Sequence, residues 1–193
     1  MFNIAVIGAS GYTGAQLVNL IVGHPQMTLK HVLVSENSAD AGKTMAQVHG
    51  NLAHLSQYVL TPLNSDLLAE LAATMDGIFL ATPHEASHDW MEALSAGKAK
   101  VFDLSGAFRL KDTDVFAKHY GFAHTSVDCL DKAVYGLAEY QADALKSANI
   151  VAVPGCYPTA SLLALKPLFN AGLLDTSMRP IINAVSGVSG AGR

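Results

Sequence analysis

Short apolar runs and longer stretches of helical periodicity alternate along most of the chain. A continuous apolar run of about four to eight residues is typical of a strand that is buried on both faces. Such runs occupy residues 2–7, 29–34, 77–81, 100–104, 150–153 and 180–185. Apolar positions at helical spacing occupy residues 12–22, 66–73, 86–96, 141–148 and 159–170. The alternation predicts an α/β fold, a doubly wound parallel sheet with helices on both faces.

Two segments interrupt this alternation. Residues 35–54 are polar and contain glycine, whereas residues 105–140 mix charged, aromatic and turn residues with weak periodicity. Long excursions of this kind in an α/β protein usually lie at the ligand-binding edge of the sheet. The sequence stops in VSGVSGAGR, a Gly/Ser loop directly after a predicted strand. Because an independent domain rarely ends in such a place, we expect a fragment of a longer protein.

Composition narrows the classes of partner. The 193 residues are 50% apolar, and 12 basic against 16 acidic side chains give a formal net charge of -4. No Lys/Arg-rich block attracts nucleic acid, and no apolar stretch is long enough for a bilayer. We therefore expect a cytoplasmic protein with a small-molecule partner. Two cysteines cannot build a multi-thiolate metal centre or a disulfide framework, so we expect no metal site.

A glycine-rich turn joins the first predicted strand to the first predicted helix in IAVIGASGYTGAQLVNLI. Gly8, Gly11 and Gly14 recur there at three-residue intervals. Glycine permits a tight turn and lets backbone amides approach a pyrophosphate at the positive end of a helix. The pattern favours dinucleotide binding over a turn that serves packing alone.

The end of the second predicted strand bears on the choice of dinucleotide. An NAD-selective site places an acidic side chain there to accept from the ribose hydroxyls. This chain has Ser35, with Glu36 next and Lys43 further along the loop. A hydroxyl tolerates a 2′-phosphate better than a carboxylate does, and Lys43 could offset its charge. We therefore expect NADP(H), with the ordinary loop role of Ser35 and Lys43 as the alternative.

Cys156 lies between a predicted strand and a predicted helix in VAVPGCYPTASLLALK. A thiol at a helix N-terminus feels aligned peptide dipoles, which favour the nucleophilic thiolate. Gly155 leaves space for a substrate carbonyl. A buried structural cysteine is the competing interpretation, which spacing alone does not exclude. Cys129 is flanked by Asp128 and Asp131, which disfavour a thiolate, and we interpret it as structural.

A dinucleotide loop combined with an activated thiol indicates a particular reaction class. The thiol attacks an acyl carbon, and a hydride then moves to or from the nicotinamide. The predicted activity is reduction of an acyl group to an aldehyde, or the reverse.

Five motifs in this order, GASGYTGAQL, DLSGAFRL, YGLAEY, VPGCYPTA and NAVSGVSGAGR, resemble the N-acetyl-gamma-glutamyl-phosphate reductase family. The resemblance extends over essentially the whole chain. It implies an NADPH-dependent enzyme of arginine biosynthesis that reduces N-acetyl-gamma-glutamyl phosphate to N-acetylglutamate 5-semialdehyde through a cysteine thioester, with release of phosphate. It also implies a Rossmann-like NADP-binding domain over residues 1–148 and the start of an α+β catalytic, substrate and oligomerisation domain over residues 149–193.

The resemblance assigns roles position by position. The implied nucleophile is Cys156. The implied pyrophosphate loop consists of Gly8, Ser10, Gly11, Tyr12, Thr13 and Gly14. The other implied cofactor contacts are Ser35 at the 2′-phosphate, Thr82, Ser105, Ser186 and Gly187. The implied substrate contacts are Arg109, Gly155, Tyr157, Ser189 and Arg193. For Arg109, a planar fork suits a carboxylate or phosphate, and a surface ion pair with Asp112 is the alternative.

The sequence departs from the family pattern in its length. Family members continue into a domain that completes the substrate pocket, forms the oligomer interface and supplies a histidine acid/base. That histidine is not found here, and we expect His84 and His88 to open and face a helix rather than to act as bases. The resemblance therefore implies weak turnover, and a homo-oligomer for a full-length chain.

Two other readings stay open. An aspartate-semialdehyde dehydrogenase-like enzyme would apply the same thiol chemistry to a shorter acyl phosphate, although GCYPTA and SGVSGAGR favour the first family. A non-catalytic dinucleotide-binding module would keep the glycine loop without needing a thiol at a helix terminus.

Overall fold

The computed structural model describes residues 1–192, and its centre is a seven-stranded sheet. All pairings between its strands are parallel, in the order β3-β2-β1-β4-β5-β7-β6. The strands are β1 (Phe2–Ile7), β2 (Met27–Val34), β3 (Thr61–Pro62), β4 (Gly77–Leu80), β5 (Lys100–Asp103), β6 (Val134–Tyr135) and β7 (Ile150–Ala152). The predicted doubly wound parallel sheet is confirmed.

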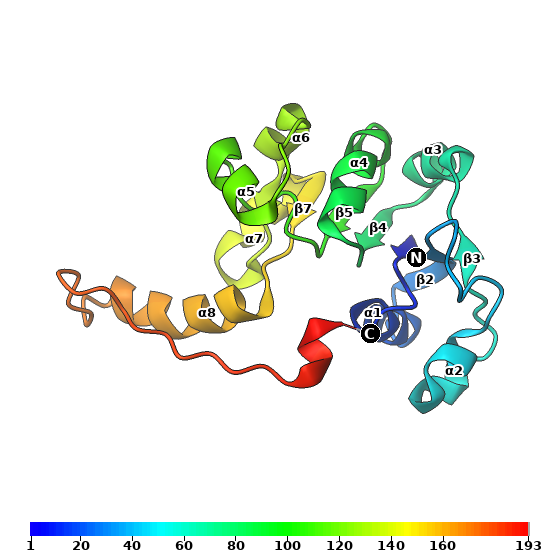
Figure 1. The fold of residues 1–193 in the computed structure, drawn as a ribbon, viewed down its shortest axis with the longest axis horizontal. Coiled ribbons are helices and arrows are strands. Elements are labelled where there is room, and N and C mark those ends of the chain that lie inside the picture. Colours follow the sequence, from blue (N-terminus) through cyan, green and yellow to red (C-terminus); the bar gives the residue numbers. More distant parts are fainter. Residues whose placement is uncertain (193) are drawn as a thin grey trace.

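Helices connect these strands and cover the sheet (Figure 1). The α-helices are α1 (Tyr12–Val22), α2 (Met45–Val48), α3 (Ser65–Thr74), α4 (His84–Ser95), α5 (Thr113–Tyr120), α6 (Val127–Lys132), α7 (Ala138–Ser147) and α8 (Cys156–Asn170). The 3-10 helices are η1 (Gly50–Leu55) and η2 (Val188–Ala191). None of the helices within residues 1–192 has the length and apolar character needed to cross a membrane.

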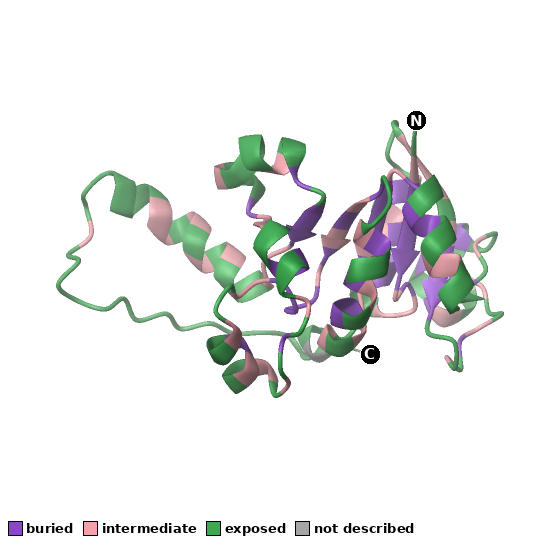
Figure 2. Cartoon of the chain, turned by 90° about the horizontal axis from the view of Figure 1, so that it is seen from above, coloured by how far each residue is buried: buried purple, intermediate pink, exposed green. Residues whose placement is uncertain are grey.

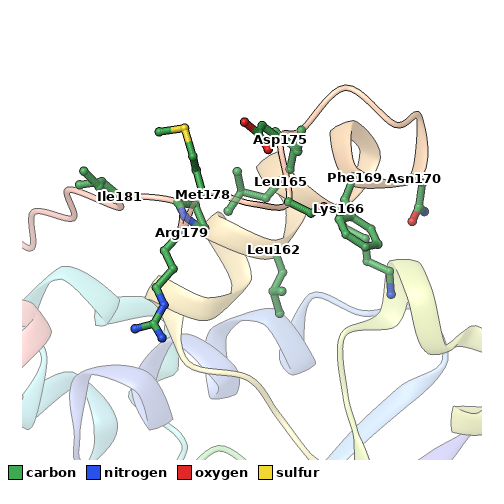
Figure 3. Close-up of a pocket in the computed structure, with 12 residues that line it drawn as sticks. Leu162, Leu165, Lys166, Phe169, Asn170, Asp175, Met178, Arg179 and Ile181 are labelled. Atoms are coloured by element: carbon green, nitrogen blue, oxygen red, sulfur yellow. The ribbon is translucent and has the colours of Figure 1, made fainter.

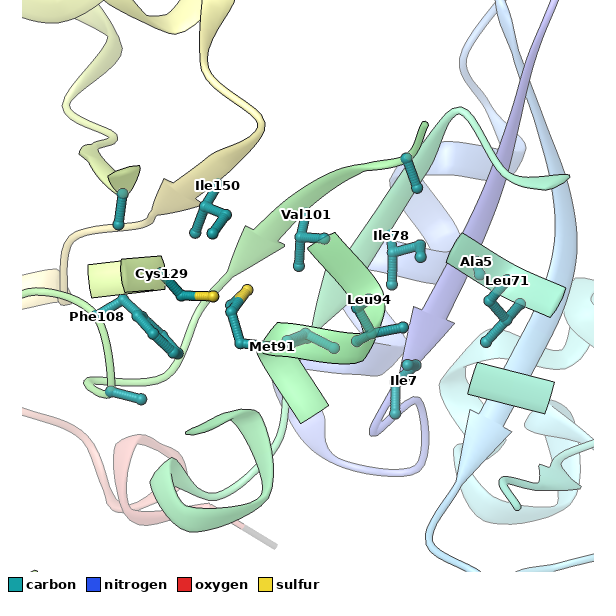
Figure 4. Close-up of a cluster of buried hydrophobic side chains, with 14 of the residues drawn as sticks. Ala5, Ile7, Leu71, Ile78, Met91, Leu94, Val101, Phe108, Cys129 and Ile150 are labelled. Atoms are coloured by element: carbon teal, nitrogen blue, oxygen red, sulfur yellow. The ribbon is translucent and has the colours of Figure 1, made fainter. Parts of the chain in front are cut away.

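Hydrophobic side chains pack on both faces of the sheet because successive residues of a strand point to opposite sides. Along β1, Ile4 and Val6 join a cluster with Val18 of α1. Ala5 and Ile7 join a second cluster, drawn in Figure 4, which includes Leu71 of α3, Met91 and Leu94 of α4, Val101, Phe108 and Ile150. The near-continuous apolar sequence of β1 thus reflects burial on both faces.

The direction of winding reverses between β1 and β4. Strand β1 pairs with β2 on one side and with β4 on the other, and the chain reaches β4 only after it has formed β2 and β3. Open α/β sheets bind ligands outside the carboxyl ends of their strands at such a switch point. The loops that begin at Gly8 and Ala81 meet there, where such sheets bind their ligands.

Five of the six predicted strands and all five predicted helices are confirmed, with ends shifted by up to three residues. The strand predicted at residues 180–185 is wrong. Ile181 and Val185 are 90% and 95% exposed, and this segment pairs with no strand in the described part of the chain. An apolar segment becomes a strand only when a neighbouring strand satisfies its backbone groups. The short elements α2, β3, α5, α6 and β6 were not predicted.

The chain after β7 differs from the rest in its burial. Figure 2 shows the strands largely buried, whereas α8 and the segment that follows it are exposed or intermediate. Helix α8 contains no buried residue. The division expected after residue 148 stays a prediction, although β7 belongs to the same sheet and carries that sheet to Ala152.

Candidate active site

Two glycines of the first loop are required by close packing. Gly8 has a positive φ of 83°, and a Cβ placed on it would lie 2.2 Å from the Ala81 carbonyl oxygen. A Cβ on Gly14 would lie 2.2 Å from the Gly8 carbonyl oxygen. A Cβ on Gly11, by contrast, would meet only the Gly8 oxygen at 3.6 Å. Packing inside the protein therefore explains Gly8 and Gly14, whereas Gly11 borders open space.

Helix α1 begins beside that open space without a polar side chain to cap it. Gly11 is the N-cap residue, no side chain accepts from the first amides, and the first turn contains no acidic residue. Tyr12 and Thr13 are exposed, and Ser10 is half-buried. Helix N-termini with free amides attract anions. The six residues predicted for the pyrophosphate loop thus form one turn at the switch point, and their contact with a cofactor stays a prediction.

Ser35 lies at the same edge of the sheet. The amides of Gly8 and Ala9 donate to the Leu33 carbonyl at 2.9 and 3.0 Å, so the end of β2 adjoins the glycine loop. Ser35 is exposed two residues further on. The Lys43 ammonium lies 2.9 Å from the Asp40 carboxylate, so its charge is balanced within its own loop. This pairing weakens the expectation that Lys43 offsets the charge of a 2′-phosphate.

Thr82 is placed against the glycine loop from the other side. Its methyl carbon lies 3.1 Å from the position of a Cβ on Gly8, and its hydroxyl lies 2.8 Å from the hydroxyl of Ser87. The predicted cofactor residue is therefore next to the loop, with its side chain oriented by α4.

Ser105 is buried and hydrogen-bonded within its own loop. Its hydroxyl donates to Asp103 at 2.9 Å and accepts from the Ala107 amide at 3.1 Å, while its amide donates to the other Asp103 oxygen at 2.9 Å. Sequence reasoning assigned no role to Asp103. Burial raises the pKa of the Asp103 carboxyl, opposed chiefly by the hydrogen bonds from Ser105 and Ser87 and by the charge of Arg109. Ser105 thus holds the loop after β5, and its contact with a cofactor stays a prediction.

Arg109 connects two strand ends. Its Nε donates to the Val153 carbonyl at 2.8 Å, and its Nη2 donates to the Leu104 carbonyl at 2.7 Å. Its Nη1 lies 3.2 Å from the position of a Cβ on Gly155. The alternative ion pair with Asp112 is not found in residues 1–192, where the Asp112 carboxylate caps α5 instead. The guanidinium therefore reaches the turn before Cys156, and its Nη1 lies next to Gly155.

Cys156 is the first residue of α8, after the N-cap residue Gly155. The thiol is exposed, whereas Cys129 is buried in the core, as expected for a structural cysteine. The amide and hydroxyl of Thr159 donate to the Gly155 carbonyl at 3.0 and 2.9 Å, which fixes the first turn. Tyr157 is exposed beside the thiol. The structure thus brings together Arg109, Gly155 and Cys156 at the carboxyl end of β7.

The last predicted residues are not brought into this group. Ser186, Gly187 and Ser189 are exposed, and they form hydrogen bonds with residues of the same short segment, 186–192. Arg193 lies outside the described residues. Figure 1 shows the chain turning back after α8, with η2 close to its end. Their contacts with cofactor and substrate stay predictions.

A cavity of about 820 Å³ lies between α8 and residues 174–181, with mostly apolar walls (Figure 3). Leu162, Leu165 and Phe169 contribute from the helix, and Met178 and Ile181 contribute from the returning segment. Cys156 and Arg109 do not line it. The cavity therefore belongs to the packing of α8 and not to the thiol.

Four histidines occupy structural positions around the site. The His84 Nδ1 accepts from the Gly106 amide at 2.7 Å, and the His88 Nε2 accepts from the Thr125 amide at 3.1 Å. His84 is the first residue of α4, and His88 lies on the buried face of the same helix, as predicted. His124 and His49 are buried, and sequence reasoning did not identify either. Within residues 1–192 no group of three or more His, Cys, Asp or Glu residues could hold a metal ion.

Comparison with known proteins relates the whole chain to one group of enzymes. Residues 3–148 match the family model described as semialdehyde dehydrogenase, NAD binding domain, and residues 156–193 match the semialdehyde dehydrogenase dimerisation domain. N-acetyl-gamma-glutamyl-phosphate reductases of Alteromonas mediterranea and Pseudoalteromonas atlantica are 63% and 61% identical to this chain over all of its length. The chain spans 57% and 56% of those two relatives.

The solved structures support the same fold. Aspartate semialdehyde dehydrogenase II of Vibrio cholerae, complexed with ASA, superposes with a TM-score of 0.60 at 21% identity. That match covers 89% of this chain and 47% of the other. With a parallel sheet, a glycine turn at its switch point and family models matched on both sides of β7, the chain belongs to the semialdehyde dehydrogenase family.

Proposed function

We propose that this chain supplies the NADPH-binding and thiol-bearing part of an acyl-phosphate reductase of arginine biosynthesis. The reaction is reduction of N-acetyl-gamma-glutamyl phosphate to N-acetylglutamate 5-semialdehyde, with release of phosphate. One observation carries the proposal. An exposed cysteine opens α8 at the edge of the sheet that also holds the glycine turn, with Arg109 beside it.

The free amides at the start of α1 suit the cofactor pyrophosphate, and Gly11 gives it room. The exposed hydroxyl of Ser35, at the end of β2, suits the 2′-phosphate and favours NADP(H) over NAD(H). NADPH held by these residues would supply a hydride to the acyl carbon. The side chains of this chain position that carbon, and Cys156 forms the covalent bond to it.

The sulfur of Cys156 attacks the carbonyl carbon of the acyl phosphate. The bond from that carbon to the phosphate oxygen breaks, phosphate leaves with the electron pair, and a thioester forms. After a hydride has reached the same carbon, the carbon–sulfur bond breaks and the electron pair returns to Cys156 as the aldehyde leaves. Arg109, whose Nη1 faces the Gly155 side, binds an anionic group of the substrate.

The relatives are longer, and we assign two tasks to the part that they add. One is the proton donor, because His84 and His88 are hydrogen-bonded to the backbone within the first domain and not to Cys156. The other is completion of the substrate pocket and of a homo-oligomer interface that begins with residues 156–193. Without the proton donor, we expect the chain by itself to turn over substrate about 10² to 10⁴ times more slowly than an enzyme that contains this group.

The reactivity of Cys156 tests this proposal. A thiol at a helix N-terminus reacts faster than a free thiol because the amide dipoles favour its anion. We expect iodoacetamide to alkylate Cys156 about tenfold faster at pH 7 in the folded chain than in the urea-unfolded chain, with mass spectrometry locating the adduct. Cys129 serves as the internal buried control.

A rate no higher than that of Cys156 in the urea-unfolded chain would favour a non-catalytic dinucleotide-binding module. NADPH titration of the same sample, followed by cofactor fluorescence, tests the other half of the proposal. An aspartate-semialdehyde dehydrogenase-like activity is the second candidate, because the solved relatives share its fold. The names of the far more similar relatives favour the N-acetylated substrate.

A further inference from the structure

His49 makes a buried contact with the glycine loop that the proposed reaction does not use. The side chain is 7% exposed, and its Nε2 lies 2.8 Å from the carbonyl oxygen of Ser10. A carbonyl oxygen only accepts hydrogen bonds, so the Nε2 carries the proton and donates. The ring of His49 also lies beside that of Tyr12, with 6.1 Å between their centroids and an angle of 57° between their planes.

This contact fixes one peptide unit at both ends. The Ser10 carbonyl accepts from His49, and the amide of the same peptide, which belongs to Gly11, donates to the Gly8 carbonyl at 3.3 Å. The next carbonyl, that of Gly11, accepts from the Ala15 amide at 2.9 Å and starts the helical ladder. The orientation of the Ser10–Gly11 peptide therefore sets the direction in which the first amides of α1 point.

His49 is itself held rigidly. Its amide donates to the Met45 carbonyl at 2.8 Å, and its carbonyl accepts from the Leu52 amide at 2.8 Å. Met45 and Leu52 are buried in the hydrophobic cluster that also packs against α1. The imidazole is thus anchored to the same core as the helix that it orients.

We propose that His49 is a positioning residue of the dinucleotide site. Its Nε2–H holds the Ser10–Gly11 peptide so that the first amides of α1 meet the cofactor pyrophosphate. His49, unlike Ser35 at the start of the same polar segment, then contributes to cofactor affinity by orienting the loop rather than by touching the cofactor. This inference rests on the proposed binding of NADPH.

Three variants of the chain separate the hydrogen bond from general packing. His49→Leu removes the donor, and His49→Gln keeps an amide donor near the position of Nε2. His54→Leu is the matched control, because His54 lies in the same segment and its Nε2 contacts the Asn19 side chain of α1 at 2.8 Å, away from the loop. Circular dichroism and thermal unfolding verify that each variant is folded.

We expect His49→Leu to weaken NADPH binding about tenfold, His49→Gln to stay within about twofold of the parent, and His54→Leu to leave the affinity unchanged. Titration with adenosine 2′-monophosphate, followed by NMR, supplies a second readout. That ligand has no pyrophosphate, so its affinity is expected to be the same in His49→Leu and the parent chain.

Distinct results would overturn distinct claims. A parent chain that does not bind NADPH contradicts the proposed function. A parent that binds NADPH no better than His49→Leu contradicts the role of His49. Equal loss in His49→Leu and His49→Gln, or equal loss of NADPH and adenosine 2′-monophosphate, would also overturn it, because packing rather than the donor would then be responsible.

Discussion

The three glycines of the first loop share one spacing but answer to different physical requirements. Gly8 and Gly14 are needed because backbone atoms occupy the space that a side chain would fill. Gly11 has an ordinary φ of -74° and open space beside it. The spacing of the glycines does not show which of them packing requires, whereas the structure does.

This difference predicts opposite outcomes for two alanine substitutions. Gly14→Ala forces its Cβ against the Gly8 carbonyl and is expected to destabilise the fold by about 3 kcal/mol or more. Gly11→Ala is expected to cost about 1 kcal/mol or less in stability, and to weaken NADPH binding at least about tenfold because the methyl group obstructs the pyrophosphate. Urea unfolding and NADPH titration measure the two effects. Equal losses of stability in both variants would contradict this division of roles.

At the residue scale, the sequence predicts site residues that stand in local motifs. It does not predict residues whose role depends on contacts with distant parts of the chain. The glycine turn, Arg109 and Cys156 stand in recognisable local patterns. His49 has its partner 39 residues away, and the role of Asp103, at the end of β5, depends on burial and on Ser87 of α4. Such partners become visible only when the sheet brings their strands and loops together.

At the scale of elements, the segment after β5 was the hardest to predict. Helices α5 and α6 have 8 and 6 residues, too short to show a clear apolar period. One signal was nevertheless present, because Asp112 caps α5 and Gly121 ends it with a φ of 83°. Helix α6 depends on Lys111, whose ammonium donates to the carbonyls of Leu130, Asp131 and Ala133 at its end. No local pattern announces that contact.

An aromatic cluster joins this segment to α4 and predicts a dependence of stability on pH. The His124 ring packs against Phe108, Phe116 and His88 at centroid distances of 5.1, 4.9 and 4.8 Å, and the side chain is buried. Burial, and next the charge of His88, lower the pKa of His124 below its ordinary value of 6.5, and a hydrogen bond to the Ala107 backbone opposes them only in part. The folded chain therefore favours the neutral ring.

Because the unfolded chain takes up the proton first, this contribution is complete above pH 6.5 and is lost as the pH falls from 6.5 through the lower folded pKa. The loss is at most about 1.4 kcal/mol per pH unit for one proton. Thermal unfolding between pH 8 and pH 5 should show a smaller decrease for His124→Phe than for the parent. Parallel curves for the two proteins would exclude His124 as the source.

At the scale of the whole molecule, the chain combines a well-packed sheet domain with an exposed helix. Strands β1, β2, β4, β5 and β7 and the helices α1, α3 and α4 share two hydrophobic clusters, whereas α8 buries no residue and borders an apolar cavity. The predicted strand at residues 180–185 is absent for the same reason, since nothing among residues 1–192 pairs with it. Periodicity predicts which face of an element is apolar, but not whether a partner covers that face.

Hydrogen exchange should reveal this contrast. Local opening requires little free energy where few apolar contacts are lost. The amides of α8 are therefore expected to exchange at least about a hundredfold faster than those of β1 and β4, as measured by mass spectrometry of peptic fragments. A dilution series is the control, because protection of α8 that rises with concentration indicates self-association. Protection equal to that of β1 at every dilution would contradict the prediction.

The two backbone hydrogen bonds of Arg109 have a consequence for anyone who wishes to redesign the specificity of this scaffold. The same guanidinium that faces the Gly155 turn also ties the end of β5 to the end of β7. Lysine would keep the positive charge but could not reproduce this fork. A library that varies position 109 to recruit new substrates would therefore also displace the nucleophile, and lost selectivity would be hard to distinguish from a misplaced thiol.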